Sequence, residues 1–167
     1  MARLNWRQIL IHFFAFCLFL YSFQTFAFLY DIKLTEIIIL SNSGNSKDAF
    51  IKSGKTVMDN INFVFWIVFS QLISLVIAFA ISLTISIRRH WFWVNSLITL
   101  MLTYALYRFD LLGWPYYKKQ MLSPGHMFDN LIVEFLLIGV IFLAAGLLLF
   151  FLRSVTKFIE HKNVPGD

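Results

Sequence analysis

Four long apolar runs constrain this chain more than any other feature of its sequence. They cover residues 8–30, 60–87, 91–113 and about 131–152, and each contains roughly twenty or more residues. A helix rises about 1.5 Å per residue, so each run is long enough to cross a hydrocarbon core of about 30 Å. Because an isolated strand would leave its backbone groups unsatisfied in lipid, all four runs are expected to be helices.

The composition agrees with a membrane protein. Of the 167 residues, 59% are hydrophobic and 14% are charged, whereas a soluble domain is nearer half apolar and a quarter charged. A soluble core of this size could not bury that excess. We therefore predict an all-α integral membrane protein, a single domain formed by a four-transmembrane-helix bundle with outer loops at 31–59 and 114–130. A cleaved signal peptide is the weaker interpretation of the first run, which is too long and lacks a small-residue cleavage site.

The distribution of Lys and Arg predicts which side each loop occupies. Six of these residues are spread over the two longer loops, and seven lie in short segments close to the spans: Arg3, Arg7, Arg88, Arg89, Arg153, Lys157 and Lys162. The denser set predicts that both termini lie inside the cell. The turn at 88–90 is so short that the second and third spans should form a tight antiparallel hairpin. Compact loops and the lack of Asn-x-Ser/Thr acceptor sites favour a bacterial inner membrane.

Two rows of small or polar side chains should face one another across this hairpin. Their members are spaced by multiples of four residues, except Gln71, which lies next to Ser70. The rows are Ser70, Gln71, Ser74, Ser82 and Ser86 on the second span, and Asn95, Thr99, Thr103 and Tyr107 on the third. Small residues let membrane helices approach closely, and hydroxyl and amide groups can bond between them. The rows are therefore interpreted as a helix-packing surface, and the alternative is a polar lining for a small-molecule path.

Charged residues inside the spans are the sharpest candidate site. Arg108 and Asp110 lie near the end of the third run, and Glu134 lies near the start of the fourth. Their similar depth in the outer leaflet predicts that Glu134 pairs with Arg108, since an unpaired charge in lipid is costly. Asp110 should point elsewhere, because it lies two positions after Arg108 and so on a different face of the helix. The pair is either a structural ion pair or a proton- or substrate-handling site.

No residue pattern predicts a metal site or a cofactor. His12 has no second His, Cys, Asp or Glu at a ligand spacing and is interpreted as a polar tip that reaches the headgroups. Cys17 is the single cysteine and is expected to act as a small hydrophobe. Residues 49–56 match a relaxed phosphate-loop pattern, but an outer loop leaves no room for the nucleotide-binding sheet that such a loop requires.

The functional expectation follows from this lack of catalytic motifs. The first hypothesis is a non-catalytic small membrane subunit that binds partner proteins in a larger envelope complex. The alternatives are a homo-oligomeric channel or small-molecule or proton transporter, and a membrane-embedded enzyme acting on a lipid or quinone. The expected partners are the lipid bilayer and other membrane proteins, or further copies of the chain. The net charge of +5 does not indicate nucleic acid, because the basic residues flank the spans.

Overall fold

Every regular element in the computed structural model is a helix. The model describes residues 4–40, 54–109 and 130–160, and within them there is no strand. The elements are α1 (Trp6–Phe28), α2 (Ile32–Leu40), α4 (Val57–Arg88), α5 (Val94–Arg108), α7 (Leu131–Phe151) and α8 (Arg153–Glu160). The prediction of an all-α chain is confirmed for this part of the protein.

Three of these helices are long and apolar enough to cross a membrane: α1, α4 and α7, which correspond to the first, second and fourth apolar runs. The third run contains α5, which has 15 residues. Such a helix is about 22 Å long, shorter than a hydrocarbon core of about 30 Å. The last residues of that run, 110–113, lie outside the described part. The chain is thus a multi-pass membrane protein, and three of the described helices are long and apolar enough to span the bilayer.

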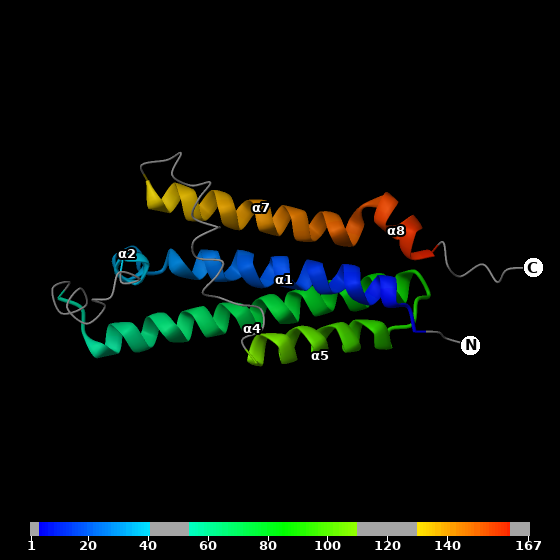
Figure 1. Ribbon diagram of the computed structural model, residues 1–167, viewed down its shortest axis with the longest axis horizontal. Helices are drawn as coiled ribbons and strands as arrows, with labels where there is room; N and C mark the ends of the chain where they lie inside the picture. The colour runs from blue at the N-terminus through cyan, green and yellow to red at the C-terminus, as the bar shows by residue number, and fades with distance from the viewer. Residues whose placement is uncertain (1–3, 41–53, 110–129, 161–167) are drawn as a thin grey trace, which may run out of the picture.

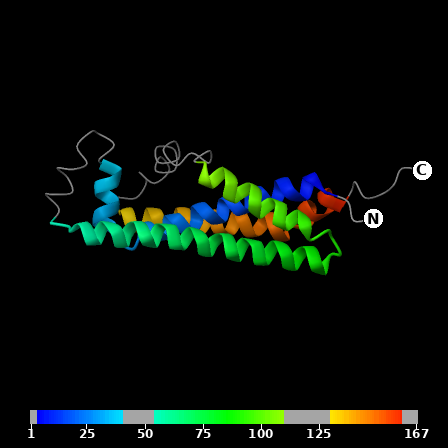
Figure 2. The same ribbon diagram turned by 90° about the horizontal axis from the view of Figure 1, so that it is seen from below.

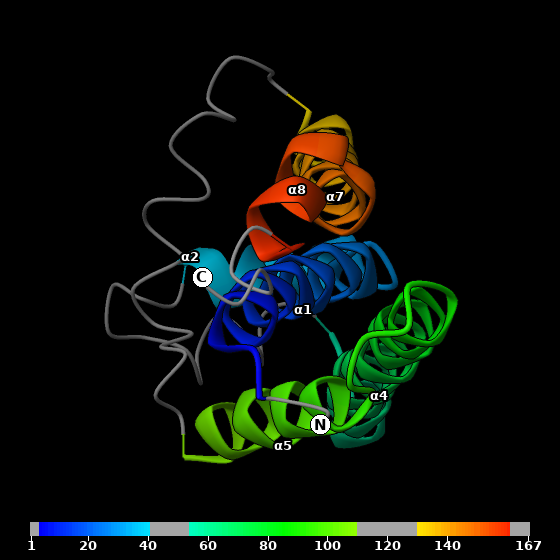
Figure 3. The same cartoon turned by 90° about the vertical axis from the view of Figure 1, so that its right-hand side faces the viewer.

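Helix α1 lies at the centre of the arrangement. Figure 1 shows α7 on one side of α1 and the α4–α5 hairpin on the other, and the end-on view in Figure 3 shows the same order. In the most apolar stretch of each helix, 56% of the residues of α1 are buried, against 22% in α4 and 28% in α7. The outer helices therefore present most of their apolar side chains to lipid, while α1 contacts protein on several faces.

Two glycines bring α7 against α1. An added Cβ at Gly139 would lie 2.4 Å from the ring of Phe26, and one at Gly146 would lie 2.8 Å from the ring of Phe19. The close approach also lets Ser22 on α1 donate its hydroxyl to the backbone oxygen of Gly139 at 2.7 Å. Lipid provides no hydrophobic driving force for helix association, so close packing at small residues stabilises the contact instead.

The hairpin between α4 and α5 closes through a Schellman motif, in which two amides return to the last turn of α4. Trp91 donates its backbone N–H to Ser86 O at 2.8 Å, and His90 donates to Ile87 O at 3.1 Å. His90 takes a φ of 54°, the left-handed conformation in which glycine is usual. The two helices consequently run back along each other, as Figure 2 shows.

Both described termini and the α4–α5 turn lie at one end of the bundle (Figure 1), which we call the terminal end. Helix α7 stops where Leu152 becomes extended, with φ −63° and ψ 124°, and α8 then turns back over this end. Thr156 and Ile159 of α8 are buried, whereas Arg153 and Lys157 are exposed. No apolar run covers these residues, and the structure makes them an amphipathic helix.

Residues of α1 bind the carboxyl end of α8. Asn5 caps α1 and also donates its Nδ2 to Ile159 O at 3.2 Å. Arg7 donates Nη1 to Phe158 O at 3.1 Å, and its guanidinium lies 4.5 Å from the Phe158 ring centroid. The last carbonyls of a helix lack partners within it and carry partial negative charge, so an amide and a cation stabilise them. The start of the described chain is thereby joined to its end.

At the opposite end, which we call the loop end, α2 lies across the bundle. Its Leu34 packs in a buried cluster with Phe28, Phe63 and Phe135, and Thr35 donates its hydroxyl to Phe28 O at 2.7 Å. This apolar stretch of the predicted outer loop is therefore helical and packs on the bundle.

An ion pair and a helix cap follow at the loop end. Lys55 Nζ lies 2.5 Å from Asp31 Oδ2. Partial burial alone would raise the pKa of Asp31, but the hydrogen bonds from Lys55 and from the backbone of Leu34 outweigh it, so this pKa lies below its ordinary value. Thr56 forms a capping box with Asp59 at the start of α4. Lys55 and Thr56 belong to the phosphate-loop match, and both have structural roles here.

Candidate functional site

Six polar side chains gather where α1 meets the α4–α5 hairpin, near the terminal end. They are Gln8 and His12 of α1, Ser82 and Ser86 of α4, and Asn95 and Ser96 of α5, and each is at most 1% exposed. Gln8 and His12 are four residues apart, so they lie on the same face of α1. We call this group the polar cluster.

Gln8 binds both helices of the hairpin. Its Nε2 donates to Ser86 Oγ at 2.8 Å, and its Oε1 accepts from Asn95 Nδ2 at 2.8 Å. The Oδ1 of Asn95 accepts in turn from the backbone N–H of Asn5, at 3.5 Å. One glutamine therefore links α1, α4 and α5, and the amide of Asn95 is used on both sides.

The hydroxyls of the polar cluster form a chain with one consistent direction. Ser82 donates to Ser96 Oγ at 2.8 Å, and Ser86 donates to the backbone oxygen of Ser82 at 2.8 Å. A hydroxyl has only one proton to donate, so the 2.9 Å contact between Ser86 and Ser96 must carry the proton of Ser96. His12 Nδ1, 2.6 Å from Ser82 Oγ, must then be the protonated ring nitrogen. The chain ends at a backbone carbonyl, which passes no proton onward.

Buried polar side chains continue from the polar cluster toward the middle of the bundle. Thr99 and Thr103 donate to Asn95 O and Thr99 O within α5, each at 2.8 Å, and Ser74 donates to Gln71 O within α4 at 2.9 Å. Tyr107 donates its hydroxyl to Gln71 Oε1 across the hairpin. Among the described residues, no buried side-chain nitrogen or oxygen lacks a hydrogen-bond partner.

The two predicted rows meet directly at the Gln71–Tyr107 contact, whereas Ser82 and Ser86 bond Ser96, which lies beside the predicted row on α5. Ser70 is only half-buried and bonds Ile67 O within its own helix. The contribution of α1 to the same contact was not predicted from the sequence. His12 in particular does not reach the headgroups, because it is 1% exposed and bonded to Ser82. The spacing of four residues between Gln8 and His12 was the sequence feature that could have indicated a shared polar face on α1.

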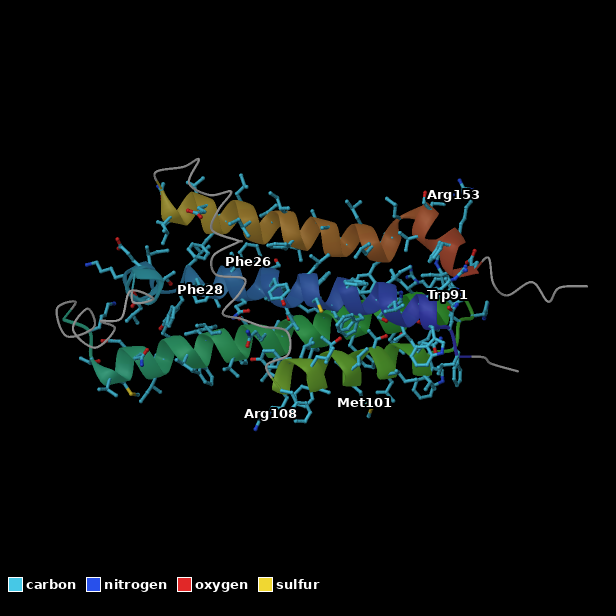
Figure 4. The ribbon with its side chains drawn as sticks, viewed as in Figure 1. Phe26, Phe28, Trp91, Met101, Arg108 and Arg153 are labelled. Atoms are coloured by element: carbon cyan, nitrogen blue, oxygen red, sulfur yellow. The ribbon has the colours of Figure 1, made fainter. Side chains whose placement is uncertain are left out.

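Arg108 and Glu134 are not brought together. Arg108 is exposed at the end of α5, where Figure 4 shows its side chain directed away from the bundle. Glu134 is buried on α7, on the other side of α1. The ion pairs between described residues are Lys55–Asp31 and Arg89–Glu160. The predicted pairing therefore does not form, because α1 separates the two helices. Asp110 lies outside the described residues.

The described residues offer little for chemistry. No three His, Cys, Asp or Glu side chains among them lie close enough to hold a metal ion, and Cys17 is buried with a free thiol in α1. Comparisons with known proteins gave no match to a protein-family model, a curated protein or a solved structure. Functional inference therefore rests on the geometry alone.

Proposed function

We propose that the protein is a non-catalytic subunit of a bacterial inner-membrane complex, a four-span bundle whose termini both lie in the cytoplasm. The grouping of basic residues supports this orientation. Arg7, Arg88, Arg89, Arg153 and Lys157 all belong to elements at the terminal end, and such residues accumulate on the cytoplasmic side. A fourth crossing would require the chain after α5 to complete the path across the membrane.

The observation that carries the proposal is the complete internal pairing of the buried polar side chains. A solute or proton path needs polar groups that can exchange partners with the solute. Here Gln8, Asn95 and the hydroxyls bond one another or nearby backbone oxygens, and the described part of the chain has no unpaired buried polar side-chain atom. Such a network fixes the position of three helices, which favours a scaffold over a channel or an enzyme.

A second observation indicates where a partner would bind. Near the loop end, α4 exposes three rings, with Phe65 60%, Trp66 41% and Phe69 40% exposed. Phe65 and Phe69 are stacked with centroids 5.7 Å apart, and Tyr30 lies 5.4 Å from Trp66. We call these four residues the aromatic face. Helix α5 ends at Arg108 and does not extend along this half of α4 (Figure 1).

Pre-arranged aromatic clusters are typical of the residues that contribute most to protein contacts. In a membrane, a rigid ring surface also packs well against another helix because packing contacts, rather than exclusion of water, drive association. We therefore propose that the aromatic face contacts a transmembrane helix of a partner protein.

The test is purification from the native membrane in a mild detergent, with mass spectrometry of the chains that remain bound. The variant Phe65→Ala/Phe69→Ala shortens the aromatic face, and Ile141→Ala/Leu148→Ala is the matched control on the exposed side of α7. We expect one partner in a fixed ratio with the parent protein and the control, and a loss of at least tenfold with the aromatic-face variant. Recovery of a homo-oligomer alone would refute the proposal and favour a channel.

A further inference from the structure

A groove of about 400 Å³ lies between α4 and α7 near the terminal end, and no residue of the polar cluster or of the aromatic face lines it. Its lining combines apolar side chains with two neighbouring arginines: Ala80, Ile81, Thr84, Ile85, Arg88, Arg89, Phe150 and Phe151. The volume is within the range of roughly 300–1,000 Å³ that is usual for small-molecule sites. Since α4 and α7 both face lipid, a molecule in the bilayer can enter from the side.

The apolar part of the groove is matched to a hydrocarbon chain. Ala80 is small, Ile81 and Ile85 follow it along α4, and the rings of Phe150 and Phe151 form the opposite wall on α7. The hydroxyl of Thr84 donates to the backbone oxygen of Ala80 at 2.7 Å, so it does not offer its proton to a ligand. Among the described residues that line the groove, the charged ones are the two arginines.

Arg88 and Arg89 lie at the end of α4, where the helix reaches the membrane surface. Both are exposed. Arg89 lies 3.4 Å from Glu160 and 5.4 Å from the ring centroid of Trp91, contacts that hold its guanidinium beside the groove. The Glu160 carboxylate offsets one of the two arginine charges, so the mouth of the groove keeps a net positive charge.

We propose that this groove binds one anionic phospholipid, with an acyl chain between α4 and α7 and the phosphate against Arg88 and Arg89. The apolar wall requires a ligand with a long hydrocarbon part, and the adjacent arginines require an anion at its end. Guanidinium groups bind phosphate oxygens through paired hydrogen bonds, and basic pockets between transmembrane helices suit anionic headgroups. The proposal does not depend on a partner subunit.

The test is lipid binding by native mass spectrometry of the purified full-length protein in detergent. The probes are dioleoyl phosphatidylglycerol and, as the zwitterionic comparison, dioleoyl phosphatidylcholine. Each arginine near an anionic headgroup is expected to contribute about fivefold in affinity. We therefore expect the parent protein to bind one phosphatidylglycerol at least fivefold more tightly than phosphatidylcholine, and Arg88→Gln/Arg89→Gln to abolish the preference.

Three variants separate a built site from general surface charge. Arg153→Gln/Lys157→Gln removes two exposed charges of α8 that do not line the groove, and it should keep the preference. Glu160→Gln breaks the ion pair to Arg89 but retains both arginines, and it should also keep the preference. Ala80→Trp fills the groove and should weaken binding of both lipids. Equal binding of the two lipids by the parent protein, or equal losses from the α8 and arginine variants, would overturn the proposal.

Discussion

Replacing Gly146 with alanine should destabilise the packing of α1 against α7. The new Cβ would lie 2.8 and 3.0 Å from two ring atoms of Phe19 and 3.4 Å from Cβ of Leu18, whereas carbon atoms prefer about 3.5–4.0 Å. The Phe19 ring has no room to move. It is 1% exposed, with its centroid 6.5 Å from that of Phe23 and 5.8 Å from that of Phe150.

Overpacking of this kind costs about 1–3 kcal/mol. Alanine in place of a helical glycine stabilises the helix by up to about 1 kcal/mol through helix propensity, so a net loss of up to about 2 kcal/mol should remain at Gly146. Gly139→Ala is the matched comparison. Its Cβ would meet the outer ring atoms of Phe26 at 2.4 Å, but Phe26 is half-buried and can swing toward lipid. We expect a change close to zero there.

The free energy of unfolding can be measured by titrating the protein in mixed micelles with a denaturing detergent, with helix content followed by circular dichroism. A second-site change separates steric overlap from other causes. Phe19→Leu makes room for Cβ, so it should cost less in the Gly146→Ala background than in the parent, with a coupling energy of at least about 0.5 kcal/mol. If Gly139→Ala is as damaging as Gly146→Ala, or if the two changes are additive, the reasoning is refuted.

Three further predictions use the same unfolding measurement. Ser96→Ala removes two hydroxyl contacts between α4 and α5 and should lower the free energy of unfolding by about 0.6–1.7 kcal/mol. Thr84→Ala should change it by almost nothing, because the exposed Thr84 hydroxyl bonds inside its own helix. Equal losses from the two variants would contradict the role of the polar cluster. His90→Gly should stabilise by up to about 1 kcal/mol because it relieves a positive φ, and His90→Ala should not. Because the pKa of Asp31 is lowered in the folded protein, its pairing with Lys55 stabilises above pH of about 4 and is lost as the pH falls further, a dependence that Asp31→Asn should reduce.

The lengths and charges of the apolar runs were sufficient to predict α1, α4 and α7. A span of apolar residues has few alternatives in lipid, because the helix must satisfy its own backbone groups. The same reasoning did not predict the end of α5 at Arg108. Hydropathy reports where a chain can stay in lipid, and it does not report where the helix stops. Helix α8 was missed for a related reason, since its alternating polar and apolar residues give no apolar run.

The candidate site shows how far a polar residue in a span can predict a contact between helices. A buried glutamine or serine indicates that a helix contact is near, because lipid offers it no partner. It does not indicate which helix supplies that contact. The contact of the α4 serines with α5 could be predicted because the two helices are consecutive in the sequence. Gln8 and His12, by contrast, bond residues about 70 to 90 positions away. Arg108 and Glu134 show the converse, since the similar depth predicted for them does not correspond to a contact across α1. The orientation of each helix about its own axis decides these pairings, and it is set by packing at sites such as Gly139 and Gly146.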